Sequence, residues 1–227
     1  MAVTVALIQL DCSSAEPVAD LAMGLIVAVM RRICEADRFV RSGAWAKQLF
    51  PAAVEVRGKT LGIVGMGRIG REIAIRAASF GMKICYHGPR RKDDVPHPYY
   101  SDLEALARDA DCLAVTCALT PATRHLVDAR ILQALGPEGF LVNVARGAVV
   151  DENALVAALA NHQLGGAALD VFRDEPHVPP ALFTMDNVVL APHMGTGTRE
   201  VREGRAEMFL HDVRAHFAGL GLKYVVA

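Results

Sequence analysis

The chain has 227 residues, of which 52% are hydrophobic and 22% are charged, and its formal net charge is -1 at pH 7. This length and composition indicate a globular protein with a substantial apolar core, formed by one large domain or by one domain and part of another. A net charge so close to zero provides no general attraction to nucleic acid or to anionic lipid. Both are therefore disfavoured as partners.

The two apolar runs near the N-terminus do not have the pattern of a targeting segment or of a membrane segment. Met1–Leu10 is apolar, but it has no basic flank and no clear cleavage site, which disfavours a secretory signal. The apolar run Val18–Met30 is shorter than the roughly 20 residues of a membrane span, and it contains Asp20. We expect no membrane segment and a cytoplasmic location, which a targeting segment upstream of Met1 would change.

The cysteines and histidines do not indicate a metal site. Cys85, Cys112 and Cys117 lie in or beside apolar, strand-like runs, and the chain has no CxxC pair. These positions are typical of reduced, buried thiols in an intracellular protein. No expected helix carries paired histidines at metal-ligand spacing, so a metal hydrolase is disfavoured.

The first 57 residues predict a strand, a long helix and a connecting arm. The strand is expected over Met1–Leu10, and the helix from Pro17, which suits a first helical turn, to about Val40. Its first half is apolar on all sides, so it is either a core helix or part of a subunit interface. Its second half is charged and predicts a solvated face. In the arm Ser42–Arg57, Trp45 is expected to be a packing anchor.

A glycine-rich turn follows a short apolar strand at Thr60–Val64. Gly65 permits the sharp turn, Gly67 leaves the backbone bare for a pyrophosphate, and Gly70 allows close packing of helix on strand. The helix that follows, Arg68–Phe80, would direct free N–H groups and a partial positive charge at the phosphates. GxGxxG also occurs in ordinary strand-turn-helix units, but the flanking strand and helix favour a dinucleotide site.

The remainder of the chain alternates strands with helices. This alternation predicts βαβ units and therefore an α/β fold with a doubly wound parallel sheet. A capping box at Ser101–Glu104 and a cap at Asp151 would begin helices, as would Thr198 for a final helix to Phe217. Further strands are expected at Lys83–Tyr86, Cys112–Thr116, Phe140–Val144, Ala167–Phe172 and Val188–Leu190.

The turn after the strand Lys83–Tyr86 indicates the type of dinucleotide. An NAD site usually has an acidic residue about 20 positions beyond the glycine motif, where it binds the ribose hydroxyls. This chain has Gly88 there, followed by Arg90 and Arg91. Two guanidinium groups can bind the additional phosphate of NADP, which an aspartate would repel. The alternative is a solvated basic turn.

Three further residues follow successive strands of the expected sheet: Arg146, Glu175 and His193. Because ligands of open α/β sheets bind at the carboxyl ends of the strands, these side chains are expected to meet there. A cation, a carboxylate and a histidine together can perform carbonyl chemistry. Taken singly, each has a simpler explanation that is favoured: a helix-cap charge for Arg146, a surface carboxylate for Glu175 and a hydrogen-bonded packing histidine for His193.

Together, these motifs resemble the D-isomer-specific 2-hydroxyacid dehydrogenases over nearly the whole chain. Within that family the chain is similar to plant-type hydroxyphenylpyruvate and hydroxypyruvate (glyoxylate) reductases. The resemblance rests on Gly65–Gly70, Asn143–Gly147, Asp170–Pro176 and Pro192–His193, and further on Arg31–Glu35, Arg41–Trp45, Ala134–Gly139 and His193–Thr198.

The resemblance implies a Rossmann-type domain that reduces small 2-oxoacids, such as hydroxypyruvate, glyoxylate or 4-hydroxyphenylpyruvate, with NADPH, in a homodimer. Arg146 would bind the substrate carboxylate and polarise its ketone, His193 would donate the proton, and Glu175 would pair with His193. Asp170 would help to position the nicotinamide. The implied cofactor-binding residues are Gly65, Gly67, Arg68, Ile69, Gly70, Gly88, Arg90, Arg91, Cys117, Ala118, Thr123, Val144, Ala145, Arg146, Asp170, His193 and Gly195.

The chain also departs from the family pattern. Members begin with about a hundred further residues that build most of the substrate domain, so Met1 corresponds to a point inside that domain. We expect residues 1–57 to be a remnant of it with the interface helix and arm, 58–198 to be the NADP-binding domain, and 199–227 to return to the substrate domain. The alternatives are a dinucleotide-binding dimer module without catalysis, or an NAD-dependent dehydrogenase.

Overall fold

The computed structural model describes residues 15–224, and the strand expected at Met1–Leu10 lies outside them. A seven-stranded, fully parallel sheet has the order β3-β2-β1-β4-β5-β6-β7. The order reverses direction beside β1, as in a doubly wound fold, which confirms the predicted fold class. The strands are β1 (Thr60–Val64), β2 (Lys83–His87), β3 (Tyr99–Tyr100), β4 (Cys112–Val115), β5 (Phe140–Asn143), β6 (Gly166–Leu169) and β7 (Val188–Leu190).

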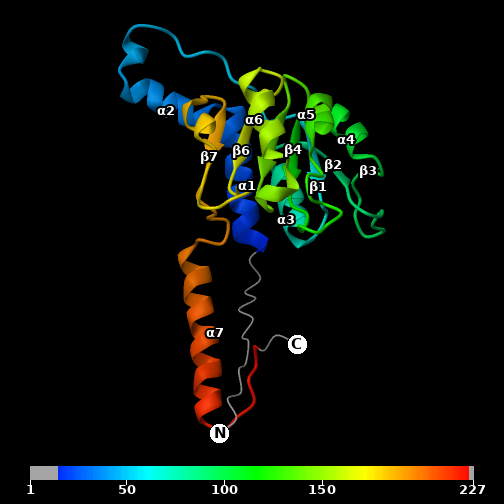
Figure 1. Ribbon diagram of the computed structural model, residues 1–227, viewed down its shortest axis with the longest axis vertical. Helices are drawn as coiled ribbons and strands as arrows, with labels where there is room; N and C mark the ends of the chain where they lie inside the picture. The colour runs from blue at the N-terminus through cyan, green and yellow to red at the C-terminus, as the bar shows by residue number, and fades with distance from the viewer. Residues whose placement is uncertain (1–14, 225–227) are drawn as a thin grey trace.

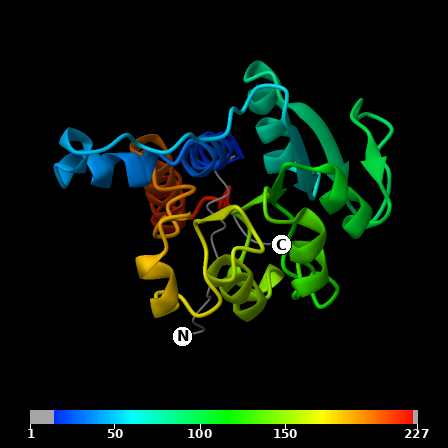
Figure 2. The same ribbon diagram turned by 90° about the horizontal axis from the view of Figure 1, so that it is seen from above.

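Helices cover both faces of the sheet (Figures 1 and 2). Between the sheet and these helices lie two clusters of buried apolar side chains. One face packs against α1 (Ala15–Met30) and α3 (Arg68–Ser79), and the other against α4 (Leu103–Asp109), α5 (Ala129–Leu135) and α6 (Glu152–Ala160). Central strands buried on both faces explain the unbroken apolar runs in the sequence.

The expected helix from Pro17 to Val40 is two helices, α1 and α2 (Ile33–Arg41). Arg32 adopts a left-handed conformation with φ 53°, which ends the regular helical hydrogen bonding between them. Its guanidinium binds the Glu35 carboxylate at 2.7 Å, within the next turn. The apolar first half packs on α3 and on β5 to β7, which supports the core-helix interpretation for the described chain.

The expectation for Trp45 is wrong in the described structure. Trp45 lies in a short 3-10 helix, Ala44–Ala46, and 66% of its surface is exposed. Figure 1 shows this arm projecting from the sheet beyond α2. The exposed Leu49 belongs to the same arm.

Two local predictions are also corrected. The cap of α4 is Asp102 rather than Ser101, because the Asp102 carboxylate accepts the N–H groups of Glu104 and Ala105. Strand β3 and helix α5 were not expected, although Asp128 caps α5 in the same way. The last helix, α7 (Arg199–Phe217), is capped by Thr198 as expected and extends away from the sheet (Figure 1).

Candidate active site

The glycine turn lies at the carboxyl end of β1, between the ends of β2 and β4. The N–H of Gly65 donates to the His87 carbonyl at 2.9 Å, and the Thr116 hydroxyl donates to the Gly65 carbonyl at 2.6 Å. Gly65 has φ 105°, and a Cβ on Gly70 would lie 2.4 Å from the Gly65 carbonyl oxygen. Two of the three predicted glycine roles, the sharp turn and the close helix packing, are therefore present in the structure.

The N-terminus of α3 is suitable for a pyrophosphate. Its N-cap, Gly67, is exposed and contributes no side-chain hydrogen bond, and a Cβ there would meet no atom within 4 Å. The bare backbone leaves room for a phosphate beside N–H groups at the positive end of a 12-residue helix. The residues present therefore fit a dinucleotide.

Gly67→Ala is expected to lower dinucleotide affinity about 10-fold or more with little change in stability, because the new methyl group would occupy the phosphate's approach. Gly67 has φ −84°, which alanine tolerates, and its Cβ would meet no protein atom. Titration calorimetry with NADP⁺, together with thermal unfolding, measures both quantities. Unchanged affinity would place the pyrophosphate elsewhere.

The basic turn after β2, residues 88–92, is called the arginine turn below. Arg90 and Arg91 are both exposed, and within residues 15–224 neither forms an ion pair. A Cβ on Gly88 would meet no atom within 4 Å, and as a glycine this residue contributes no acidic side chain to the turn. The turn therefore presents two available guanidinium groups beside the end of β2.

Glu175 and His193 form a hydrogen-bonded pair, as predicted. His193 Nδ1 lies 2.6 Å from Glu175 Oε2, and Glu175 Oε1 accepts the N–H of Phe172 at 3.0 Å. Burial alone would raise the pKa of the Glu175 carboxyl, but the hydrogen bonds from His193 and Phe172, with the charges of His193 and Arg146, lower it. The group is therefore a carboxylate at neutral pH, and since a carboxylate only accepts, Nδ1 donates.

Asp170 fixes the backbone that carries the histidine. The carboxylate is 2% exposed, and its two oxygens accept the N–H groups of Met194 at 2.7 Å and Gly195 at 2.9 Å. His193 itself has φ 51°, a strained left-handed conformation for a non-glycine residue, and the clamp on the next two residues maintains it. Burial raises the pKa of Asp170 despite these two hydrogen bonds.

Arg146 projects from a tightly built loop after β5. Fully buried Asn143 accepts the N–H of Ala145 at 3.0 Å and donates to the Arg146 carbonyl at 3.2 Å. Arg146 is exposed, and its charge contributes to lowering the pKa of Glu175. Arg146, Glu175 and His193 follow the neighbouring strands β5, β6 and β7, so the three lie at the same edge of the sheet, as expected.

One supporting residue was not expected. Glu152, at the start of α6, is 9% exposed and accepts the N–H of Arg173 at 3.0 Å, which ties α6 to the segment that carries Glu175. Acidic residues are common at the start of a helix, so the sequence pattern explains Asp151 and Glu152 without any further role. The pattern therefore did not predict that Glu152 binds the backbone of a different loop.

The loop after β4 lies against the glycine turn. A Cβ on Gly65 would approach the Cys117 backbone nitrogen to 2.7 Å, so this loop closes over the turn. Thr123 donates to the Ala118 carbonyl at 2.7 Å and thereby orders the loop.

Two cysteine thiols near this region stay protonated at neutral pH. Burial raises the pKa of the Cys117 thiol, and it raises the pKa of buried Cys85 to about 11.

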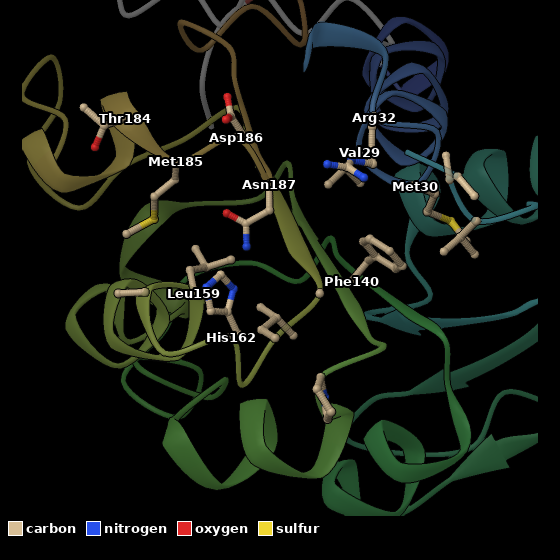
Figure 3. A pocket seen from close by; sticks show the side chains of 17 residues that line it. Val29, Met30, Arg32, Phe140, Leu159, His162, Thr184, Met185, Asp186 and Asn187 are labelled. Atoms are coloured by element: carbon tan, nitrogen blue, oxygen red, sulfur yellow. The ribbon is translucent and has the colours of Figure 1, made fainter. Parts of the chain in front are cut away.

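Two cavities lie at opposite ends of the strands. One of about 410 Å³ borders the Glu175–His193 pair and is otherwise lined by apolar side chains including Phe172 and Phe183. Another of about 570 Å³ lies at the amino ends of β5, β6 and β7, between Arg32 and His162 (Figure 3). Ligands of open α/β sheets bind at the carboxyl ends, so the second cavity is not the candidate active site.

Within residues 15–224, no helix is both long and apolar enough to cross a membrane. Over the same residues, no group of three or more His, Cys, Asp or Glu side chains is arranged to hold a metal ion.

A doubly wound parallel sheet, a glycine turn at its switch point and an Arg, Glu and His set at the same strand ends define a nicotinamide dinucleotide-binding domain of the dehydrogenase class. The family model described as "D-isomer specific 2-hydroxyacid dehydrogenase, NAD binding domain" matches residues 23–195. The chain belongs to this family.

Curated relatives and solved structures agree with this assignment. The chain is 50% identical to glyoxylate/hydroxypyruvate reductase A of Arabidopsis thaliana, and the alignment covers 91% of this chain and 66% of that relative. It is 48% identical to hydroxyphenylpyruvate reductase of Plectranthus scutellarioides, and that alignment covers 90% of this chain and 65% of the relative. It therefore spans just under two thirds of the length of these relatives.

Among solved structures, 2-hydroxyacid dehydrogenase from Ketogulonicigenium vulgare Y25 superposes with a TM-score of 0.90 at 41% identity, covering 98% of this chain and 71% of that one. The NADPH-dependent glyoxylate/hydroxypyruvate reductase from Sinorhizobium meliloti, solved in complex with NADP and malonate, has a TM-score of 0.88 at 37% identity, covering 98% and 70%.

Proposed function

We propose that the protein reduces small 2-oxoacids to D-2-hydroxyacids with NADPH, and that it does so as a homodimer. The observation that carries this proposal is the Glu175–His193 hydrogen bond, formed at the strand ends that also hold Arg146 and the glycine turn. Hydroxypyruvate, glyoxylate and 4-hydroxyphenylpyruvate are the candidate substrates, since the two curated relatives described above are named for the reduction of such compounds.

When bound, the reduced nicotinamide would supply a hydride to the substrate's carbonyl carbon. Negative charge then develops on the carbonyl oxygen, and the chain's residues must stabilise it. Exposed Arg146 provides a cation for the substrate carboxylate and for that oxygen. Because Glu175 accepts a hydrogen bond at His193 Nδ1, the other ring nitrogen, Nε2, is left to donate a proton to the oxygen.

Following NADPH absorbance in the presence of each oxoacid tests this function. We expect NADPH oxidation with at least one of the three. Since the chain spans just under two thirds of its relatives' length, turnover by this chain alone is part of the proposal. Binding of NADPH without reduction of any oxoacid would instead support a dinucleotide-binding module without catalysis.

The arginine turn carries the proposed preference for NADPH. Arg90→Ala and Arg91→Ala are each expected to lower NADPH affinity about 10-fold and to leave NADH affinity nearly unchanged, because each removes charge-assisted hydrogen bonds to the additional phosphate. Fluorescence titration with both cofactors measures the ratio. Arg130→Ala, which removes an exposed guanidinium paired with Asp128 on α5, is the matched control.

Equal affinity of the unaltered protein for NADPH and NADH would contradict this preference. It would favour an NAD-dependent dehydrogenase of the same family, with the arginine turn as a solvated basic turn.

A further inference from the structure

The arginine turn is short and exposed, yet it must hold two guanidinium groups in a fixed arrangement to recognise a phosphate. Arg90 and Arg91 lie at its centre and have no ion-pair partner within residues 15–224. Their recognition of a phosphate therefore depends on how the backbone on either side is held, because an unfixed turn would have to be ordered on binding.

Two tyrosines hold the two ends of this turn. The N–H of Lys92, at the far end, donates to the Tyr86 phenol oxygen at 2.8 Å. The Tyr99 hydroxyl donates to the carbonyl of Gly88, at the near end, at 3.0 Å. Both arginines thus lie between two backbone positions that phenol groups bind from the sheet.

The tyrosines themselves are fixed. Tyr86 is in β2 and only 1% exposed, and Tyr99 is its register partner in the neighbouring strand β3. Their ring centroids lie 5.3 Å apart, in a tilted aromatic contact. A second anchor lies just beyond the turn, where Arg71 of α3 binds the Asp94 carboxylate at 2.8 Å.

Building on the proposed NADPH specificity, we infer that Tyr86 and Tyr99 are specificity-determining positioning residues, which preorder the arginine turn for the phosphate on the adenosine ribose. Neither phenol is assigned to touch the dinucleotide. Each acts through the backbone that presents Arg90 and Arg91, so its loss should affect NADP⁺ and leave NAD⁺, which lacks that phosphate, almost unaffected.

Tyr86→Phe and Tyr99→Phe each remove one hydroxyl and retain the ring contact. We expect each to weaken NADP⁺ binding about 3- to 10-fold, the effect of one lost hydrogen bond and the added cost of ordering the turn. NAD⁺ binding should change by less than about twofold on the same physical grounds. Titration calorimetry of the full chain with NADP⁺ and with NAD⁺ measures both.

Tyr100→Phe is the matched control. It is the next residue of β3, but its hydroxyl donates to Asp109 at 2.7 Å, away from the turn, so the affinity ratio should be unchanged. If buried Tyr86→Phe fails to fold, half-buried Tyr99→Phe carries the test, and retained NAD⁺ binding shows that a variant is folded.

Three results would overturn the inference. Unchanged NADP⁺ affinity in both variants would show that the phenols do not order the turn, and equal losses for NADP⁺ and NAD⁺ would show a general structural role. If the unaltered protein itself binds both dinucleotides equally, the proposed cofactor preference fails and the inference fails with it, an outcome visible before any variant is made.

Discussion

His193→Asn is expected to lower kcat for oxoacid reduction by about 10²- to 10⁴-fold, the usual contribution of a general acid. Asparagine is the preferred test because residue 193 has φ 51°, and asparagine adopts that left-handed conformation more readily than alanine does. The replacement thus removes the ring nitrogens without imposing additional backbone strain. Stopped-flow or steady-state NADPH oxidation measures the loss.

The matched control is His162→Asn, another left-handed histidine, with φ 55°, beside the cavity at the opposite end of the sheet. It should leave kcat and the unfolding temperature unchanged. His193→Ala is a second variant with the same expected loss of kcat. Activity that survives both changes at residue 193 would exclude it as the proton donor.

Gly147→Ala is expected to destabilise the fold by about 3 kcal/mol, near the upper end for overpacked positions. A Cβ there would lie 1.9 Å from the Phe172 carbonyl carbon and 2.3 Å from the Arg173 nitrogen. Both are backbone atoms of the segment that leads to Glu175, so relief requires the segment to move. The unfolding temperature should fall by about 6–12 °C for a domain of this size.

Gly24→Ala is the control for this stability effect. Gly24 lies inside α1, and a Cβ there would meet no atom within 4 Å, so alanine should raise stability by about 0.5–1 kcal/mol through its better helix propensity. Differential scanning calorimetry compares the two variants. An unfolding temperature of Gly147→Ala equal to that of the unaltered protein would contradict the close contact between the two active-site loops.

The sheet was largely predictable because its central strands are buried on both faces. The central strand β1, Thr60–Val64, has the same bounds in the sequence analysis and in the structure, and so does the edge strand β7, Val188–Leu190. The two-residue strand β3 was not predictable, since Tyr99–Tyr100 is too short to show alternation. The break at Arg32 was missed because arginine favours helices, so the residue type does not predict a left-handed turn there.

The sequence predicted which strand ends form the site, but not the hydrogen bonds that join the loops around it. The positions of His193 and Glu175 after apolar strands predicted that both lie at the strand ends, and the family resemblance implied that they pair. The 2.6 Å contact confirms the pair. The backbone clamps made by Asp170 and Glu152 were not expected, because they join loops that are distant in the sequence. The phenol contacts of the arginine turn were not expected either, although they join residues only 6 and 11 positions apart in the chain.

A crystal structure of the full chain with NADP⁺ tests the central claim most directly. We predict that the ribose phosphate contacts Arg90 and Arg91, that the pyrophosphate lies on the exposed backbone of Gly67, and that the nicotinamide ring faces His193 and Arg146. A dinucleotide bound with its phosphates away from Gly67, or with its nicotinamide remote from the Glu175–His193 pair, would contradict the account.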